Sequence, residues 1–156
     1  MNESKELEFF LNLISWAHKT CYEYISHLPE EALDWKLMPF TPSARWILIH
    51  IIKDQEWLAE LICEKKATKE YNFTERYPKV DLEQLKGDYT KTMERIEKRL
   101  RECLKESDFN KEIDYKGYKI SVKEALFEYV HHLFNHEGQI AQIITAWKRK
   151  QRAITE

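Results

Sequence analysis

Two histidines in the second half of the chain, His132 and His136, have the residue type and spacing of paired metal ligands. On a helix, a separation of four residues places both imidazoles on one face, one turn apart. Two inward imidazoles need hydrogen-bond partners or a metal, and one divalent ion satisfies both neutral rings. Six histidines in 156 residues also give on the order of 0.2 such pairs by chance. The alternative is therefore a pair of hydrogen-bonded core histidines.

A third histidine, His50, lies in a dense apolar segment between Ile47 and Ile51. A neighbouring helix of a bundle can bring its ring to the level of the pair. Three imidazoles from two helices leave coordination positions open for water or substrate, which is typical of a catalytic rather than a closed structural metal site. The alternative for His50 is a core histidine bonded to a backbone or carboxylate group. The zincin pattern HExxH is excluded, because Leu133 follows the first histidine of the pair.

Three polar side chains lie close in sequence to these histidines. Asp54 follows His50 by one turn of helix, and Glu128 precedes the first histidine of the pair by one turn. Either carboxylate can orient a ligand ring or act as a further ligand. A solvated surface carboxylate is the alternative for both, and it is the one that we expect for Glu128. Gln139, three residues after His136, can bond a metal-held water or a facing helix.

Four amphipathic helices are predicted to carry these side chains. Apolar residues recur every three to four positions in each, and only three glycines and four prolines interrupt the chain. A capping box of Asp81 and Gln84 predicts the start of the third helix. A second box, Ser121 with Glu124, predicts the start of the fourth. The predicted helices cover residues 2–27, 41–64, 81–103 and 121–149.

The segments between the helices differ from one another. Residues 65–80 form a polar connection. Within residues 108–120, alternating apolar residues flank Lys116 and Gly117, which predicts a short two-stranded hairpin before the last helix. Together the elements predict an all-α fold, a four-helix bundle that forms one domain over residues 1–156. The long connections leave the order of helix directions open.

The composition limits the classes of partner. With 25 Lys and Arg against 27 Asp and Glu, the net charge of −2 predicts no general attraction to nucleic acid or to an anionic membrane. No apolar run approaches the roughly 18 residues of a membrane span, and the first residues lack the basic region of a secretory signal. Cys21, Cys63 and Cys103 are odd in number and far apart, so we expect reduced thiols in a cytoplasmic protein.

Two segments resemble the DinB/YfiT-like metalloenzyme superfamily. The first is S-A-R-W-I-L-I-H, which ends at His50, and the second is H-L-F-N-H-E-G-Q-I, which begins at His132 and matches the family pattern HxxxH-x-G-Q-I. The resemblance implies that His50, His132 and His136 are the metal ligands. It also implies a bundle in up-down-down-up order, often as a homodimer. Glu137 departs from the family, where arginine is common at this position.

The resemblance further implies a chemistry. The divalent metal of the family is variously zinc, nickel or manganese, and three imidazoles also suit iron. Characterised relatives include S-transferases and isomerases that use bacillithiol, mycothiol or glutathione. We therefore expect an enzyme that transfers a low-molecular-weight thiol to a small electrophile, with the metal lowering the pKa of the thiol. The alternatives are a metal-dependent hydrolase with the same site, and a non-catalytic, dimeric, stress-related bundle. The departure at Glu137 is the reason to retain the non-catalytic alternative.

Overall fold

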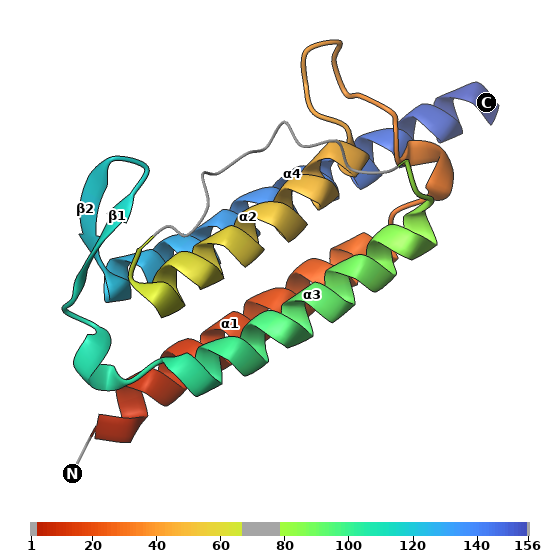
Figure 1. Cartoon of the computed structure of the whole chain (residues 1–156). Helices are drawn as coiled ribbons and strands as arrows, with labels where there is room; N and C mark the ends of the chain where they lie inside the picture. Colours follow the sequence, from red (N-terminus) through yellow and green to blue (C-terminus); the bar gives the residue numbers. More distant parts are fainter. Residues whose placement is uncertain (1–2, 67–78, 156) are drawn as a thin grey trace.

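The computed structural model describes residues 3–66 and 79–155 (Figure 1). Most of the predicted connection 65–80 lies outside the described residues. Two short 3-10 turns, Glu30–Ala32 and Glu106–Asp108, accompany the main elements. The four helices are α1 (Glu3–Ser26), α2 (Ala44–Glu64), α3 (Leu82–Cys103) and α4 (Val122–Thr155), and the two strands are β1 (Glu112–Tyr115) and β2 (Tyr118–Ser121).

The helices form a bundle in which α1 and α4 run in one direction and α2 and α3 in the other (Figure 1). Ring contacts agree with the parallel pairing of α1 and α4. Phe10 packs on Phe127 with ring centroids 5.0 Å apart, and Trp16 packs on Phe134 at 5.4 Å. The predicted four-helix bundle and the up-down-down-up order implied by the resemblance are confirmed.

The helix ends follow the predicted local signals. The Ser43 side chain accepts the backbone N–H of Trp46, which caps the start of α2. At the start of α3, Asp81 and Gln84 form the predicted capping box. The largest difference lies in α4, which continues to Thr155 instead of ending near residue 149. No glycine or proline in this last stretch stops the helix.

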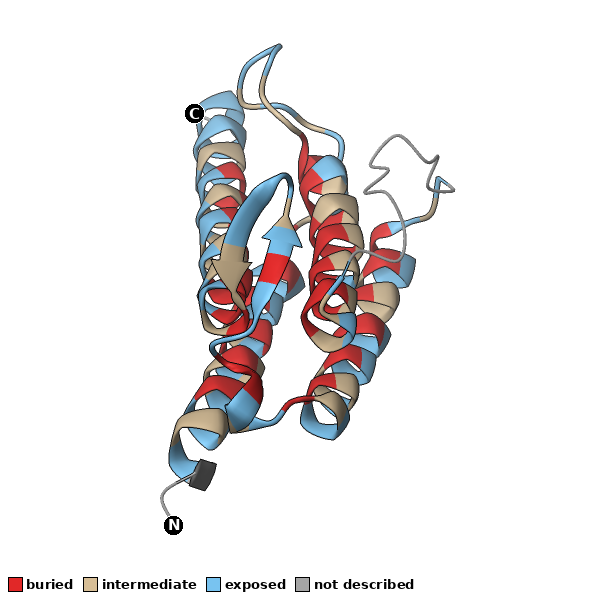
Figure 2. Ribbon diagram, turned by 60° about the vertical axis from the view of Figure 1, so that its left-hand side comes forward, coloured by how far each residue is buried: buried red, intermediate tan, exposed pale blue. Residues whose placement is uncertain are grey.

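The predicted hairpin is also confirmed. β1 and β2 pair antiparallel, with Ile113 opposite Ile120 and Tyr115 opposite Tyr118. The two residues between them have positive φ angles, 54° for Lys116 and 88° for Gly117, as a tight two-residue hairpin turn requires. Figure 2 shows the hairpin lying across the outer side of the bundle, where β1 contacts both α2 and α4.

The core lies between the four helices, whose inward faces are buried along their length (Figure 2). One of its polar residues, His18, is fully paired. His18 on α1 donates through Nδ1 to Glu97 on α3 at 2.6 Å, and it accepts through Nε2 from the Tyr129 hydroxyl on α4 at 2.7 Å. These bonds connect three helices, so His18 is a satisfied core histidine and is separate from the three predicted ligands. None of the described helices is apolar enough over a sufficient length to cross a membrane.

The prediction of three reduced thiols is wrong for two of the cysteines. Cys63 and Cys103 form a disulfide with Cα atoms 5.5 Å apart. Helical periodicity places each cysteine on its own helix, but it does not tell that α2 and α3 run parallel and end at the same level. Cys21 is free and buried, and burial raises its pKa to about 12, so it is not a nucleophile at neutral pH. The cytoplasmic expectation therefore loses the support of reduced cysteines.

Candidate metal centre

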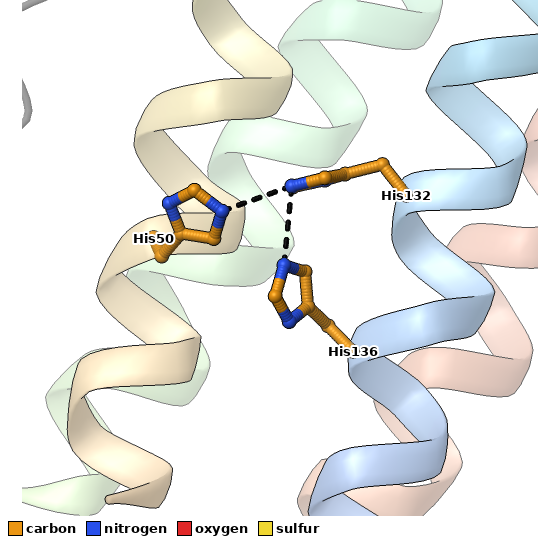
Figure 3. A group of neighbouring side chains, drawn as sticks. All are labelled: His50, His132 and His136. Atoms are coloured by element: carbon orange, nitrogen blue, oxygen red, sulfur yellow. Dashed lines mark hydrogen bonds between the residues drawn. The ribbon is translucent and has the colours of Figure 1, made fainter. Parts of the chain in front are cut away.

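Three imidazole rings from two helices converge in the bundle (Figure 3). His50 comes from α2, and His132 and His136 come from successive turns of α4. The Nε2 atom of His132 lies 2.9 Å from Nε2 of His50 and 3.1 Å from Nε2 of His136. One ligand atom from each residue lies within 4.8 Å of the other two. The structure thus brings together the three residues that the sequence singled out.

The spacing of these nitrogens suits a single metal ion. Zinc–nitrogen bonds are about 2.0–2.1 Å long, so two ligands of a tetrahedral site lie roughly 3.3 Å apart. The two Nε2 separations that involve His132, 2.9 Å and 3.1 Å, are within about half an ångström of that value, and all three ligand atoms lie within 4.8 Å of one another. Three ligands leave at least one coordination position for water or substrate. The residues present can therefore hold a divalent metal in an open site.

The protonation of the rings also suits metal binding. Burial lowers the pKa of His132 to about 4, with the neighbouring imidazoles acting in the same direction and the Asp54 carboxylate opposing them. Burial likewise lowers the pKa values of His50 and His136. Neutral rings keep one nitrogen lone pair for an ion. Protons therefore do not compete for these nitrogens at neutral pH.

Gln139, one of the predicted neighbours, contacts a ring directly. Its Oε1 accepts the Nδ1–H of His136 at 2.8 Å. With the proton held on Nδ1, the lone pair of His136 lies on Nε2 and points toward the other two rings. Gln139 thus selects the tautomer and the ring orientation that a metal ligand needs.

Gln55 is a site residue that the sequence reasoning missed. It is fully buried, and its amide nitrogen lies 2.9 Å from Nδ1 of His132 and 3.3 Å from the carbonyl oxygen of Tyr129. Its Oε1 has no hydrogen-bond partner among the residues that the structure describes. The amide N–H group donates to the Tyr129 carbonyl oxygen and to Nδ1 of His132, so Gln55 fixes the orientation of the His132 ring. The available signal was its spacing, because Gln55 lies four residues after Ile51 and three before Leu58, on the buried face of α2.

Asp54 places a buried negative charge beside the rings. The residue is 1% exposed, and its Oδ2 lies 3.2 Å from Nε2 of His132. Its Oδ1 lies 3.7 Å from the Lys116 ammonium and has no hydrogen-bond partner among the described residues. A buried carboxylate is costly unless nearby cations or donors compensate it. A divalent ion between the three neutral rings would supply that positive charge, so Asp54 fits a metal-loaded centre.

The remaining acidic residues of α4 have other contacts. Glu128 is partly exposed, and its Oε2 lies 3.7 Å from Nδ1 of the exposed His131. This contact does not orient His132. Glu137 acts electrostatically on core groups of other helices, where it contributes to the raised pKa values of Cys21 and Tyr89. The unusual residue after the third histidine therefore has its electrostatic effect among core groups of α1 and α3.

Aromatic side chains flank the centre on two sides. The Trp46 ring stacks on His50, with ring centroids 4.9 Å apart and an interplanar angle of 21°. Toward the hairpin, Trp57 and Tyr115 have ring centroids 6.0 Å apart. The Trp46 ring restricts the orientation of His50, and the three aromatic rings give the centre a partly apolar border.

Several solved structures have the same fold as this chain. A DinB-like protein from Bacillus subtilis is 20% identical over 89% of this chain and 92% of its own, with a TM-score of 0.72. A DinB-like protein from Bacillus cereus is 17% identical over 88% and 90%, with a TM-score of 0.75. The mycothiol-dependent maleylpyruvate isomerase is 14% identical over 88% of this chain but only 65% of its own, with a TM-score of 0.66. No functionally curated protein matches the chain.

A family model gives the most direct assignment. The model of the DinB superfamily matches residues 13–140, which include all three histidines of the centre. The chain is a member of the DinB superfamily.

Proposed function

We propose that the chain is a divalent-metal-dependent enzyme that transfers a low-molecular-weight thiol to a small electrophile. The observation that carries this proposal is the convergence of three Nε2 atoms, from His50, His132 and His136, beside a buried carboxylate. Support for a thiol comes from a structural neighbour, the isomerase that depends on mycothiol. Zinc, nickel, manganese and iron are the candidate metals.

The residues of the centre have separable roles in this reaction. A bound divalent ion would lower the pKa of a thiol or water at its open position. Gln139 holds the proton of His136 on Nδ1 and leaves its Nε2 available, and Gln55 fixes the orientation of the His132 ring through a contact to Nδ1. Asp54 Oδ2 accepts the proton of the S–H group. The sulfur electron pair then forms the bond to the electrophilic carbon, and the proton passes to the leaving group or to the atom that gains the electron pair.

A thiol-consumption assay tests the proposal. Purified protein is stripped of metal, loaded with Zn²⁺, Ni²⁺ or Mn²⁺, and incubated with N-acetylcysteine and 1-chloro-2,4-dinitrobenzene. We expect conjugate formation that depends on the metal and that is lost in His132→Ala. The matched control is His131→Ala, because His131 is the adjacent histidine and its side chain is 74% exposed. Conjugation at the same rate with and without metal would contradict the proposal.

The same preparation distinguishes the alternatives. Metal-dependent cleavage of an ester such as p-nitrophenyl acetate, without thiol consumption, would indicate the hydrolase. Absence of any bound metal would indicate the non-catalytic bundle. To test the role of Asp54, we expect Asp54→Asn to lower the conjugation rate at least about tenfold while the protein still binds metal, because a general base typically contributes 10²–10⁴-fold.

We also propose that two copies associate through the seam between α1 and α4. Phe9, Trp16 and Phe127 lie on this seam and are all more than half exposed. Gly138 lies eleven residues after Phe127, on the same face of α4, and a Cβ there would meet nothing within 4 Å. A glycine inside a helix costs about 1 kcal/mol relative to alanine, so close approach of a second helix would explain it.

Light scattering after gel filtration tests the dimer. We expect twice the chain mass of 18.9 kDa for the wild-type protein and the monomer mass for Trp16→Glu. The matched control is Tyr118→Glu, because Tyr118 is an exposed aromatic residue on the hairpin, away from the seam. A monomeric wild-type protein at micromolar concentration would refute this association.

A further inference from the structure

The turn of the hairpin carries a lysine next to the three-histidine centre. Lys116 is 43% exposed, and its ammonium lies 3.7 Å from Oδ1 of Asp54. The other carboxylate oxygen, Oδ2, is the one that lies 3.2 Å from Nε2 of His132. A single carboxylate therefore separates this ammonium from the centre, while much of the lysine side chain still faces solvent.

The surroundings hold the ammonium in that position. It lies 5.1 Å from the centroid of the Tyr115 ring and 5.6 Å from that of Trp57, which is the range of cation–π contacts. Lys116 also has a φ of 54°, a left-handed conformation that favours glycine, asparagine or aspartate in such a turn. Any of those residues would adopt this backbone conformation more readily than lysine. The contacts of the side chain, not the backbone, therefore explain a lysine here.

Charge balance indicates what the ammonium can bind. Lys116 and a divalent ion together carry three positive charges, and Asp54 carries one negative charge. Because the proton of the S–H group passes to Asp54, a bound thiol that bears one carboxylate leaves one net positive charge, and a bound thiol without a carboxylate leaves two. The larger uncompensated charge is the less favourable one in a partly buried site.

We propose that Lys116 binds the carboxylate of the thiol cosubstrate, so that the centre selects acidic thiols over neutral ones. This proposal rests on the proposed function, because it needs a thiol at the three-histidine centre. An ammonium has three N–H donors, so it can bond a ligand carboxylate on its solvent side while Asp54 remains close. The hairpin is then the element that sets specificity, and the helices supply the metal ligands.

Binding of a matched pair of thiols tests the proposal. N-acetylcysteine and N-acetylcysteamine differ by one carboxylate. Each is titrated into the Co²⁺-loaded protein at low salt, and the dissociation constant is read from the sulfur-to-cobalt charge-transfer absorption. We expect the acidic thiol to bind about fivefold tighter, the size of one partly exposed charge contact. The preference should fall as salt is added.

Variants of the hairpin lysines assign the effect to one residue. Lys116→Gln should remove the preference, and Lys116→Arg should retain it. The matched control is Lys119→Gln, because Lys119 lies on the same hairpin, is 66% exposed and contacts Asp114. The control should behave as the wild type. Circular dichroism before and after each substitution confirms that the helices are unchanged.

Four results would overturn the proposal, and they differ from one another. Equal affinity of the wild type for both thiols refutes the selection itself. A preference that persists in Lys116→Gln shows that another group makes the selection. An equal loss of both affinities shows that Lys116 only supports the structure around Asp54. In these cases the proposed function stands. No charge-transfer band with either thiol refutes the proposed function, and the role of Lys116 falls with it.

Discussion

The Cys63–Cys103 disulfide should contribute strongly to stability. It joins the ends of α2 and α3 across a sequence separation of 40 residues. In the chain-entropy model, closing a loop of that length destabilises the unfolded state by about 3.9 kcal/mol at 25 °C. For a domain of this size, 1 kcal/mol changes the melting temperature by about 2–4 °C. The oxidised protein should therefore melt roughly 10 °C above the reduced protein.

Calorimetry of the oxidised and reduced forms measures this difference. Mass spectrometry first confirms that the oxidised sample has lost two hydrogen atoms relative to the reduced one. The double variant Cys63→Ser with Cys103→Ser should melt like the reduced protein, with or without reductant. Cys21→Ser retains the disulfide and should keep the full difference between the two conditions. Equal melting temperatures of the oxidised and reduced wild type would refute the reasoning, as would a difference that persists in the double variant.

Three further predictions concern the centre and the core. Zinc at 100 times its dissociation constant should add about 2.7 kcal/mol to the free energy of unfolding of the wild type and of His131→Ala, and nothing to that of His132→Ala. Melting curves measure this difference. An unchanged zinc response in His132→Ala would exclude that ring as a ligand. Gln139→Ala should weaken zinc binding about tenfold in competition with a chelator, because His136 loses the acceptor that fixes its tautomer; equal affinity would refute this role. At Glu97, burial raises the pKa, but the hydrogen bond from His18 and other attractions outweigh it and lower the net pKa. Because the pKa is lowered, ionised Glu97 stabilises the fold above its usual pKa of about 4.5, and this contribution is lost as the pH falls through the pKa of the folded state. Urea unfolding of Glu97→Gln should therefore show a smaller loss of stability on acidification than the wild type. Identical pH profiles of the two proteins would contradict this.

Local signals predicted the elements and one part of the centre. The capping boxes at the starts of α3 and α4 involve residues only three positions apart, so they hold whatever the tertiary structure is. The pairing of His132 with His136 is equally local, since helical geometry alone places them one turn apart. The hairpin follows from a glycine turn between two alternating segments.

Features that depend on packing between helices were harder to predict. His50 joins the pair only because α2 and α4 lie side by side at the right level, which the family resemblance implied but periodicity did not. The disulfide was missed because nothing local shows that α2 and α3 run parallel. Gln55 was missed because it stands in a polar stretch, between Asp54 and Glu56, where a buried polar residue cannot be distinguished from its solvated neighbours. Lys116 was noted only as part of a turn, since its contact with Asp54 is a tertiary one.

The central claim is that His50, His132 and His136 hold one divalent metal ion. Elemental analysis of protein purified without an affinity tag measures this most directly, with the metal content given per chain. We expect about one ion per wild-type chain and almost none in His50→Ala. Less than about 0.1 ion per chain in the wild type, with no rise in melting temperature on adding zinc or nickel, would contradict the account, because a ligand of the native state must stabilise it.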